Sequence, residues 1–514
     1  MVGGEISEQT RSHRVTAEDR TATTEHDLLL RGARVIDPET GLDAVRNVAL
    51  TGGTITAVTE QDVPAKKVVD LAGRVLAPGF IDLHSHAQTT SSLRVQALDG
   101  VTTALELEAG DAVPRTTYKI AEDAGRPINF GYSASWAMAR MRVLDGAAPQ
   151  GGFLGFADHC GGPRWRDKAT PKELDLILAD VESQLNEGTL GIGVLLGYAP
   201  ASGRNEYFRL ARLAARYDAP TFTHARFKNP DDPETALEGI SEVVATAMGT
   251  GAHMHVCHIN STSLRAIDEV GEVAEGARAA GLRFSTEGYP YGAGMTTINA
   301  PFLHPDNLPR VGITPGDLVV LHSGERPRDG RRLLELQLTE PGSMVAIHYL
   351  DESDPDDWSV LQKALVLPDS AVASDAIAYI GEDGGLIQDE WPLPPSASSH
   401  PRTAGTFSRF IRMMVRELDL LPLTDAIGRC TLRPAQILQS IAPRFAKKGR
   451  VQVGADADLV VFDLDTISDR STYSDPAQVS AGVDQLLVNG EFVIRDRVLL
   501  PEALPGRAMK GRLA

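Results

Sequence analysis

The chain has 514 residues, of which 42% are hydrophobic and 23% are charged, as is usual for a globular protein with room for more than one domain. Its net charge of −19 argues against binding to nucleic acid or to an anionic membrane surface. No apolar run is long enough to span a bilayer. The three scattered cysteines are too few for a disulfide framework, which favours a cytoplasmic location.

The two ends of the chain share a β-rich pattern. Residues 1–26 are polar and lack the apolar core of a secretory signal, so we expect a disordered tail there. Residues 27–76 then read as short strands, with a hairpin at Gly52-Gly53. A similar pattern returns over residues 440–512, with a second hairpin at Asn489-Gly490. Both ends are therefore predicted to build one small β-sandwich domain.

The middle, residues 77–439, alternates apolar β-rich runs with helical patterns. Eight runs read as strands: Gly79–His84, Val101–Glu108, Pro127–Ser133, Leu190–Leu196, Pro220–His224, His253–His258, Arg283–Glu287 and Ala371–Asp375. Eight strands with helical crossovers predict a (β/α)8 barrel of the TIM type. Residues 292–370 exceed the length of one crossover and predict an inserted subdomain.

The first of these strands ends in PGFIDLHSH, with His84 and His86 one residue apart. In a strand both would point to the same side, where they could pack, bond separately or share a metal. The active site of such a barrel lies where its strands end. Five of the eight strands end in imidazole or carboxylate groups, which favours a shared metal site: His84 and His86, Glu106 and Glu108, His224, His258, and Asp375.

Imidazole and carboxylate ligands together suit Zn2+ and similar ions. With one of the two glutamates these residues make six ligands, which are too many for one tetrahedral zinc. They fit two ions that share a bridging carboxylate and hydroxide, about 3.5–4 Å apart. Water bound there would ionise near a pH of about 7. Asp375 would orient that water, take its proton and pass it to a leaving group. The predicted reaction is hydrolysis at a carbonyl carbon.

A series of motifs resembles a known family. In order, the motifs are PGFIDLHSH, GVTT (Gly100–Thr103), THAR (Thr223–Arg226), HVCHIN (His255–Asn260), EGYPY (Glu287–Tyr291), ASD (Ala373–Asp375) and HPRTAGTFSRF (His400–Phe410). The series resembles the amidohydrolase superfamily, and within it the N-acyl-D-amino-acid deacylases (D-aminoacylases). The resemblance extends from Asp27 to Arg512.

The resemblance implies hydrolysis of an N-acyl-D-amino acid to a carboxylate and a free D-amino acid. It also implies roles for particular residues: metal ligation by His84, His86, His224 and His258, catalysis by Asp375, carboxylate binding by Arg402, and a place beside the substrate for Tyr289 or Tyr291. A planar guanidinium with five donors suits the task given to Arg402.

Three departures from the family pattern affect these expectations. The family usually bridges its metals with a cysteine after the second strand, where this chain has LELEAG. We expect Glu108 to replace it, with Glu106 as second choice; an oxygen ligand holds zinc less tightly and admits Mn2+ or Co2+. Asn260 stands where the family often has a substrate-binding lysine. Residues 381–399 form a longer segment than the family loop and are expected to reshape the pocket or to act as a lid.

Several alternatives stay open. His255 competes with His258 as ligand, Cys257 reads as a packing residue, and Arg226 reads equally as an anion binder or a rim charge. A hydantoinase-like or dihydroorotase-like hydrolase of cyclic amides is a rival, although the fourth strand, LGIGVLLGY, lacks the lysine that bridges the metals of those enzymes. A non-catalytic scaffold is disfavoured by the complete ligand set. Metal number, substrate side chain and assembly into a homo-oligomer are undetermined.

Overall fold

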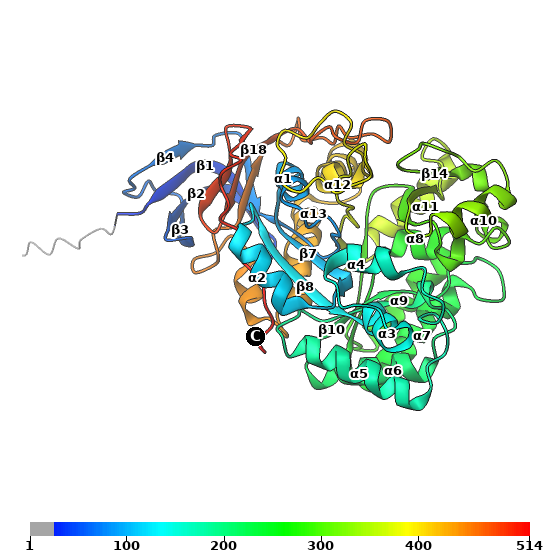
Figure 1. Cartoon of the computed structure of the whole chain (residues 1–514). Helices are drawn as coiled ribbons and strands as arrows, with labels where there is room; N and C mark the ends of the chain where they lie inside the picture. The colour runs from blue at the N-terminus through cyan, green and yellow to red at the C-terminus, as the bar shows by residue number, and fades with distance from the viewer. Residues whose placement is uncertain (1–24, 514) are drawn as a thin grey trace, which may run out of the picture.

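The computed structural model describes residues 25–513, and a barrel of eight parallel strands occupies its centre (Figure 1). The strands are β6 (Phe80–Asp82), β7 (Val101–Asp111), β8 (Asn129–Ser135), β9 (Ile192–Leu195), β10 (Pro220–His224), β11 (His253–Val256), β12 (Phe284–Gly288) and β16 (Ala371–Val372), hydrogen-bonded in this order. Ser85 and Ala376 form a parallel bridge between the first strand and the last. The predicted (β/α)8 barrel is confirmed.

Helices surround this barrel and follow its strands along the chain. They are α1 (Thr90–Leu98), α2 (Pro114–Ala124), α3 (Trp136–Asp145), α4 (Gly152–His159), α5 (Pro171–Leu185), α6 (Arg204–Arg216), α7 (Ala236–Thr250), α8 (Ile259–Ser263) and α9 (Ile267–Ala279), and later α12 (Arg402–Ile411), α13 (Leu423–Cys430) and α14 (Leu432–Leu438). A capping box between Thr170 and Glu173, with Pro171 as the first helical residue, starts α5.

Burial on both faces explains the apolar strand sequences. Every residue of β7, VTTALELEAGD, is buried, including Glu106 and Glu108. Parallel strands have the barrel interior on one face and helices on the other, so no solvent face remains for polar alternation. Two buried carboxylates in such a strand therefore need a partner of positive or metal character.

Strands from both ends of the chain join in one nine-stranded sheet. Its members are β1 (Leu28–Asp37), β2 (Leu42–Thr51), β3 (Thr54–Thr59), β4 (Val68–Asp70) and β5 (Val75–Pro78), with β17 (Leu459–Phe462), β18 (Val483–Val488), β19 (Glu491–Arg495) and β20 (Val498–Leu499). The hairpins expected at Gly52-Gly53 and Asn489-Gly490 are present. A small β domain built from both ends is thus confirmed, and its junction is the pairing of β5 with β17.

A second, smaller sheet lies between β12 and β16 in the chain. It contains β13 (Ala293–Thr297), β14 (Leu318–Val320) and β15 (Met344–His348), and α10 (Gly330–Thr339) and α11 (Pro355–Val366) accompany it. Figure 1 shows this region and the β1–β4 sheet at opposite sides of the molecule. The exact domain limits, 27–76 with 440–512, 77–439, and the insertion at 292–370, stay a prediction.

Two further expectations concern the chain ends and membranes. The predicted disordered tail lies outside the described residues except for Glu25 and His26, and His26 forms a bridge with Ala65. None of the helices within residues 25–513 combines the length and the apolarity needed to cross a bilayer.

Candidate metal centre and active site

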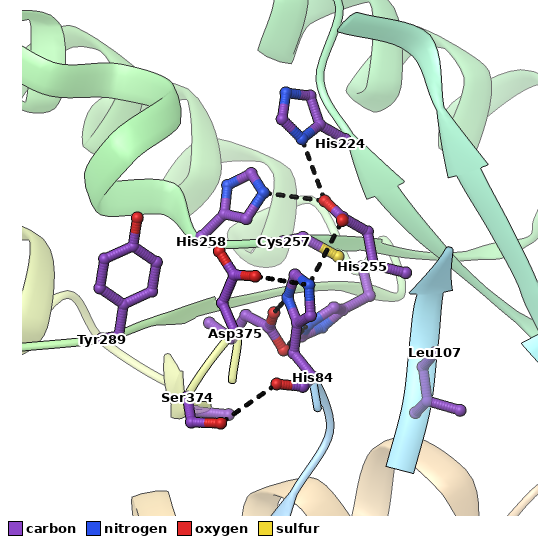
Figure 2. Close-up of polar contacts among 12 residues, drawn as sticks. His84, Leu107, His224, His255, Cys257, His258, Tyr289, Ser374 and Asp375 are labelled. Carbon is purple, nitrogen blue, oxygen red and sulfur yellow. Dashed lines mark hydrogen bonds and ion pairs between the residues drawn. The ribbon is translucent and has the colours of Figure 1, made fainter. Parts of the chain in front are cut away.

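The predicted ligands converge at the carboxyl end of the barrel. His84 and His86 follow β6, Glu108 lies near the end of β7, His224 ends β10, His258 follows β11 and Asp375 follows β16. Figure 2 shows His84, His224, His258 and Asp375 turned toward one another from these separate elements. All six side chains are buried. The residues that sequence patterns suggested therefore share one place in the fold.

The ligand atoms form two groups that Glu108 joins. One group is His84, His86 and Asp375, and the other is Glu108, His224 and His258, with the ligand atoms of each group within 4.8 Å of one another. Glu108 Oε1 lies 3.0 Å from His224 Nδ1 and 2.8 Å from His258 Nε2. Glu108 Oε2 lies 3.3 Å from His84 Nε2 and 3.7 Å from His86 Nε2. The carboxylate thus presents one oxygen to each group.

The donor set fits divalent metal ions. His84 Nε2 and His86 Nε2 lie 3.2 Å apart. Two imidazole nitrogens bound to one tetrahedral zinc at about 2.0–2.1 Å would be separated by roughly 3.3 Å. Each group offers imidazole nitrogen and carboxylate oxygen, the mixture that zinc and neighbouring ions accept. These residues can therefore hold two ions with Glu108 between them.

A second layer of carboxylates orients the ligand histidines. Glu106 Oε2 lies 2.6 Å from His86 Nδ1, and Glu287 Oε1 lies 2.6 Å from His84 Nδ1. Glu287 Oε2 also lies 3.0 Å from His255 Nε2. Such partners fix the ring tautomer and leave the opposite nitrogen free for a metal. Glu106 therefore lies behind His86, whereas Glu108 lies between the two groups of side chains. In the same way, His255 lies behind His84, while the His258 ring faces Glu108.

The buried charged groups of the centre shift one another's pKa values. Burial opposes the charged form of His84, but Asp375, Glu108 and Glu287 raise its pKa well above the usual value. Burial raises the pKa of Glu108, but nearby histidines hold it well below its usual range. Burial lowers the pKa of His224 to about 4. A neutral His224 and an ionised Glu108 are the forms in which these side chains bind metals.

Two of the ligand residues occupy backbone conformations that are rare for non-glycine residues. His258 has φ 32° and Asp375 has φ 53°. Positive φ brings side chain and backbone into close contact, and such strain gathers at functional sites. β11 and β16 end at Val256 and Val372, earlier than predicted, so both ligands leave the strand before they turn inward.

Above the ligands lies a half-open cleft of about 410 Å3, with the solvent at its mouth included. Tyr289 lines this cleft, and burial raises the pKa of its phenol to about 12, so it is neutral near pH 7. Tyr291 does not line it; its hydroxyl lies 3.4 Å from the Pro401 carbonyl oxygen. Of the two predicted tyrosines, Tyr289 is therefore the one that lines the cleft.

Arg402 lies behind the cleft wall. It is fully buried beneath the ring of Tyr289, 4.8 Å from the ring centroid. Arg402 Nη2 lies 2.9 Å from Asp375 Oδ2, yet in the described part of the chain none of its three nitrogens makes a well-formed hydrogen bond. Buried donors without hydrogen-bond partners are rare in proteins, and the charge of this guanidinium faces the carboxylate of Asp375.

The model of the amidohydrolase family matches residues 67–155 and 168–494, which is most of the chain. The chain belongs to the amidohydrolase family. This membership agrees with the resemblance carried by the motifs and with the ligand-bearing barrel.

Individual relatives match this amidohydrolase over nearly its whole length. An N-acyl-D-glutamate deacylase of Alcaligenes xylosoxydans xylosoxydans is 28% identical over 509 residues, covering 94% of this chain and 96% of the relative. A D-aminoacylase of the same organism is 26% identical, covering 92% and 95%. Among solved structures, N-acyl-D-glutamate deacylase from Bordetella bronchiseptica, complexed with zinc and a phosphonate mimic of the tetrahedral intermediate, has a TM-score of 0.74 at 23% identity, covering 95% and 100%.

Sequence patterns gave no role to two residues at or behind the cleft of this amidohydrolase. Glu287 lies one residue before the end of β12, behind His84, and the acidic end of the predicted strand 283–287 was a usable signal for it. Lys228 lines the cleft from the loop after β10, four residues beyond His224, a loop position that nothing in the motif distinguished. Arg226, by contrast, donates to Glu242 from two nitrogens at 2.8 Å and to Ser202 and Pro200, which leaves no free donor face for a substrate.

Two further predictions concern Cys257 and the segment 381–399. The thiol of Cys257 lies within 4.8 Å of the ligand atoms of His84 and Glu108, and burial raises its pKa well above the usual value. Within the described part of the chain, residues 381–399 contribute nothing to the cleft wall. They pack instead on α1 and α12, through Ile387 and Ala397 against Val95 and Ala404.

Proposed function

We propose that this amidohydrolase is a metal-dependent deacylase of N-acyl-D-amino acids, yielding a carboxylate and a free D-amino acid. The observation that carries the proposal is the joint presence of Glu108 between two ligand groups and of Asp375 at the cleft wall beside them. Similarity to an N-acyl-D-glutamate deacylase, an N-acyl-D-aspartate deacylase and a D-aminoacylase over at least 92% of this chain supports the same reaction.

The residues of the centre would hold Zn2+, with Mn2+ or Co2+ as substitutes, in two positions. We assign His84, His86 and Asp375 to one position, His224 and His258 to the other, and Glu108 to both. Bound there, the metal supplies a Lewis acid for the amide carbonyl and a water that ionises near a pH of about 7.

Asp375 is proposed as the proton carrier. Its Oδ1 lies 3.4 Å from His84 Nε2 and 3.5 Å from His86 Nε2, so it would adjoin a metal held by these residues and the water on it. Burial raises the pKa of Asp375, but Arg402 and the histidines lower it below the usual value, so the carboxylate is ionised and accepts the proton. The same proton then passes to the departing amine nitrogen.

Arg402 and Tyr289 are proposed to bind the substrate. The unsatisfied guanidinium of Arg402 attracts the α-carboxylate, and the neutral phenol of Tyr289 donates a hydrogen bond to the carboxylate or the carbonyl oxygen. A fixed carboxylate beside the metals leaves one orientation of the Cα substituents, which supports selection of one enantiomer. We also propose a cytoplasmic location, because all three cysteines are free and buried.

The proposal is tested by release of free amine from paired N-acetyl-D- and N-acetyl-L-amino acids, with added Zn2+ and with a chelator. We expect hydrolysis of D substrates alone, abolished by the chelator and restored by metal. Equal hydrolysis of L substrates would contradict the stereochemistry. No release from either series by metal-loaded protein would contradict the deacylase and favour a hydrolase of cyclic amides, although β9, the fourth strand, holds no lysine to bridge metals.

A further inference from the structure

Lys228 is a buried cation on the cleft wall with no anionic partner of its own. It is 9% exposed. Its Nζ donates to the hydroxyl of Tyr349 at 3.1 Å and lies 3.8 Å from the ring centroid of Phe302. In the described part of the chain, its close partners are thus a hydroxyl and aromatic rings, none of which carries a full negative charge.

Holding an ammonium group in this environment is costly. Burial lowers the pKa of Lys228 to about 7, and the carboxylates of Glu108 and Asp375 offset this only in part. Aromatic faces attract a cation, but more weakly than a carboxylate in contact. A carboxylate brought in by the substrate would stabilise the charged form and satisfy the remaining donors of the ammonium.

Lys228 and Arg402 adjoin different parts of the metal centre. Arg402 contacts Asp375, in one ligand group. Lys228 contacts Phe302, whose ring stacks on His224 at a centroid distance of 5.7 Å, in the other ligand group. The two cations therefore approach the cleft from different sides.

Two phenols stand between these cations. Arg402 lies under Tyr289, and Lys228 binds Tyr349. A side chain at Gly294 would come within 3.3 Å of both tyrosines, so glycine lets the two rings meet at this point of the wall. Lys228 on the cleft wall and Arg402 behind Tyr289 thus form two separate cationic positions, each beside a phenol, and a substrate with a single carboxylate would engage only one of them.

On the basis of the proposed deacylase function, we propose that Lys228 binds a second carboxylate, carried by the side chain of the amino acid, and that the preferred substrates are N-acyl derivatives of acidic D-amino acids. Arg402 keeps the α-carboxylate.

The test compares kcat and KM for N-acetyl-D-glutamate and N-acetyl-D-aspartate with their neutral isosteres, N-acetyl-D-glutamine and N-acetyl-D-asparagine. The wild-type protein should prefer the acidic substrates at least tenfold. Lys228→Met should lower kcat/KM for the acidic substrates by about 10- to 100-fold, mainly through KM, which is the range for a hydrogen bond to a charged group. For the neutral isosteres, the same substitution should reduce kcat/KM by a factor at least about ten times smaller than for the acidic substrates.

The matched control is Lys168→Met, which removes an exposed ammonium outside the cleft and should change none of these values. Metal content and thermal unfolding of both variants establish that the centre is intact. Lys228→Arg, which keeps the charge, should retain more of the acidic preference than Lys228→Met.

Three results would overturn the inference. Equal losses on acidic and neutral substrates would make Lys228 a residue for the α-carboxylate or for structure. Hydrolysis of neutral D substrates without any acidic preference would overturn the inference and leave the deacylase intact. A wild-type protein that hydrolyses no N-acetyl-D-amino acid would overturn the proposed function, and the assignment of Lys228 with it.

Discussion

At the residue scale, Glu106 and Glu108 show how two equivalent positions acquire different tasks. They lie two residues apart in β7, so both point to the same side of the strand. Glu106 Oε1 accepts hydrogen bonds from the backbone N–H groups of Ala109 and Gly110, and its other oxygen orients His86. Glu108 lies farther toward the carboxyl end, between the ligand groups. The irregular end of β7 after Glu108 thus forms backbone hydrogen bonds with Glu106, whereas the Glu108 carboxylate faces the two ligand groups.

Removing each carboxylate should therefore have a different effect on metal binding. Glu106→Ala should weaken metal affinity by about 10- to 100-fold, the range for a partner that orients a ligand. Glu108→Ala should weaken it further, because both ion positions lose a ligand at once. Metal content after dialysis against buffered Zn2+ measures the difference, with Glu272→Ala, an exposed position on α9, as the control. The opposite order would assign the bridge to Glu106.

At the element scale, Asp99 ties three distant segments together. It caps the C-terminus of α1, and its Oδ2 accepts from the Phe407 N–H of α12 at 2.8 Å. Its Oδ1 accepts from the Ser408 N–H at 3.1 Å and from the Ser480 hydroxyl at 2.8 Å. α12 begins with Arg402, so this carboxylate helps to fix the helix that carries the proposed substrate-binding arginine.

Asp99 should make the stability of the protein depend on pH. Burial raises the pKa of Asp99 to about 7, although its donors lower it. The folded protein then binds more protons than the unfolded chain between about pH 4 and pH 7, so the free energy of unfolding falls as pH rises through this window. The contribution of Asp99 to that fall between pH 5 and pH 8 is up to about 3 kcal/mol.

In the variant Asp99→Asn, whose side chain has no proton to lose, the free energy of unfolding should fall less steeply as the pH rises. Urea unfolding of wild type and variant at pH 5 and pH 8 gives the comparison, and Asp123→Asn on the exposed side of α2 serves as the control. The same pH dependence in wild type and Asp99→Asn would remove Asp99 as its source.

The segment 381–399 illustrates a second effect at this scale. Its length suggested a lid, but its residues bond to α1 instead. The Ser91 hydroxyl donates to the Glu390 carbonyl oxygen at 2.8 Å, and Arg94 Nη1 lies 2.7 Å from Asp389 Oδ1. Its apolar residues pack on the same helix and on α12. The extra length therefore covers the outside of the barrel near the β domain.

At the scale of the whole molecule, the proposed metal centre connects five strand ends that are far apart in the chain. Its proposed ligands span positions 84 to 375, and β6 and β16, where the barrel closes, are each followed within a few residues by such ligands. Closure at that seam depends on few backbone bonds, such as the His86 N–H to the Ala376 carbonyl oxygen at 2.8 Å. Bound metal would therefore hold the seam together in addition to its part in the chemistry.

Metal loading should accordingly stabilise the fold. Free metal at 100 times its Kd raises the free energy of unfolding by about 2.7 kcal/mol, if the unfolded chain does not bind. Thermal unfolding should therefore occur at a lower temperature in a chelator and recover with Zn2+ or Mn2+. Glu108→Ala should show little of this recovery. An unchanged transition temperature in chelator, with metal removal verified, would contradict the coupling.

The sequence by itself determined the eight barrel strands, the β-rich ends and the list of ligand residues. These follow from local patterns: apolar runs, turn residues and polar groups at strand ends, each legible within a few residues. The limits of that local reading appear at His258 and Asp375, which were placed at the ends of strands but lie beyond them, at positive φ.

Only the tertiary structure decided which carboxylate lies between the ligand groups, that Glu287 supports His84 and His255, and that Lys228 reaches the cleft. The same holds for the packing of residues 381–399 away from the cleft. Each of these features depends on contacts between side chains that are separated by tens to hundreds of residues in the sequence. The paths of the loops, and not local periodicity, determine which of these side chains come into contact. The pattern of strands in the sequence therefore predicts where the candidate active site lies. The packing of the connecting loops determines which position each side chain takes in it.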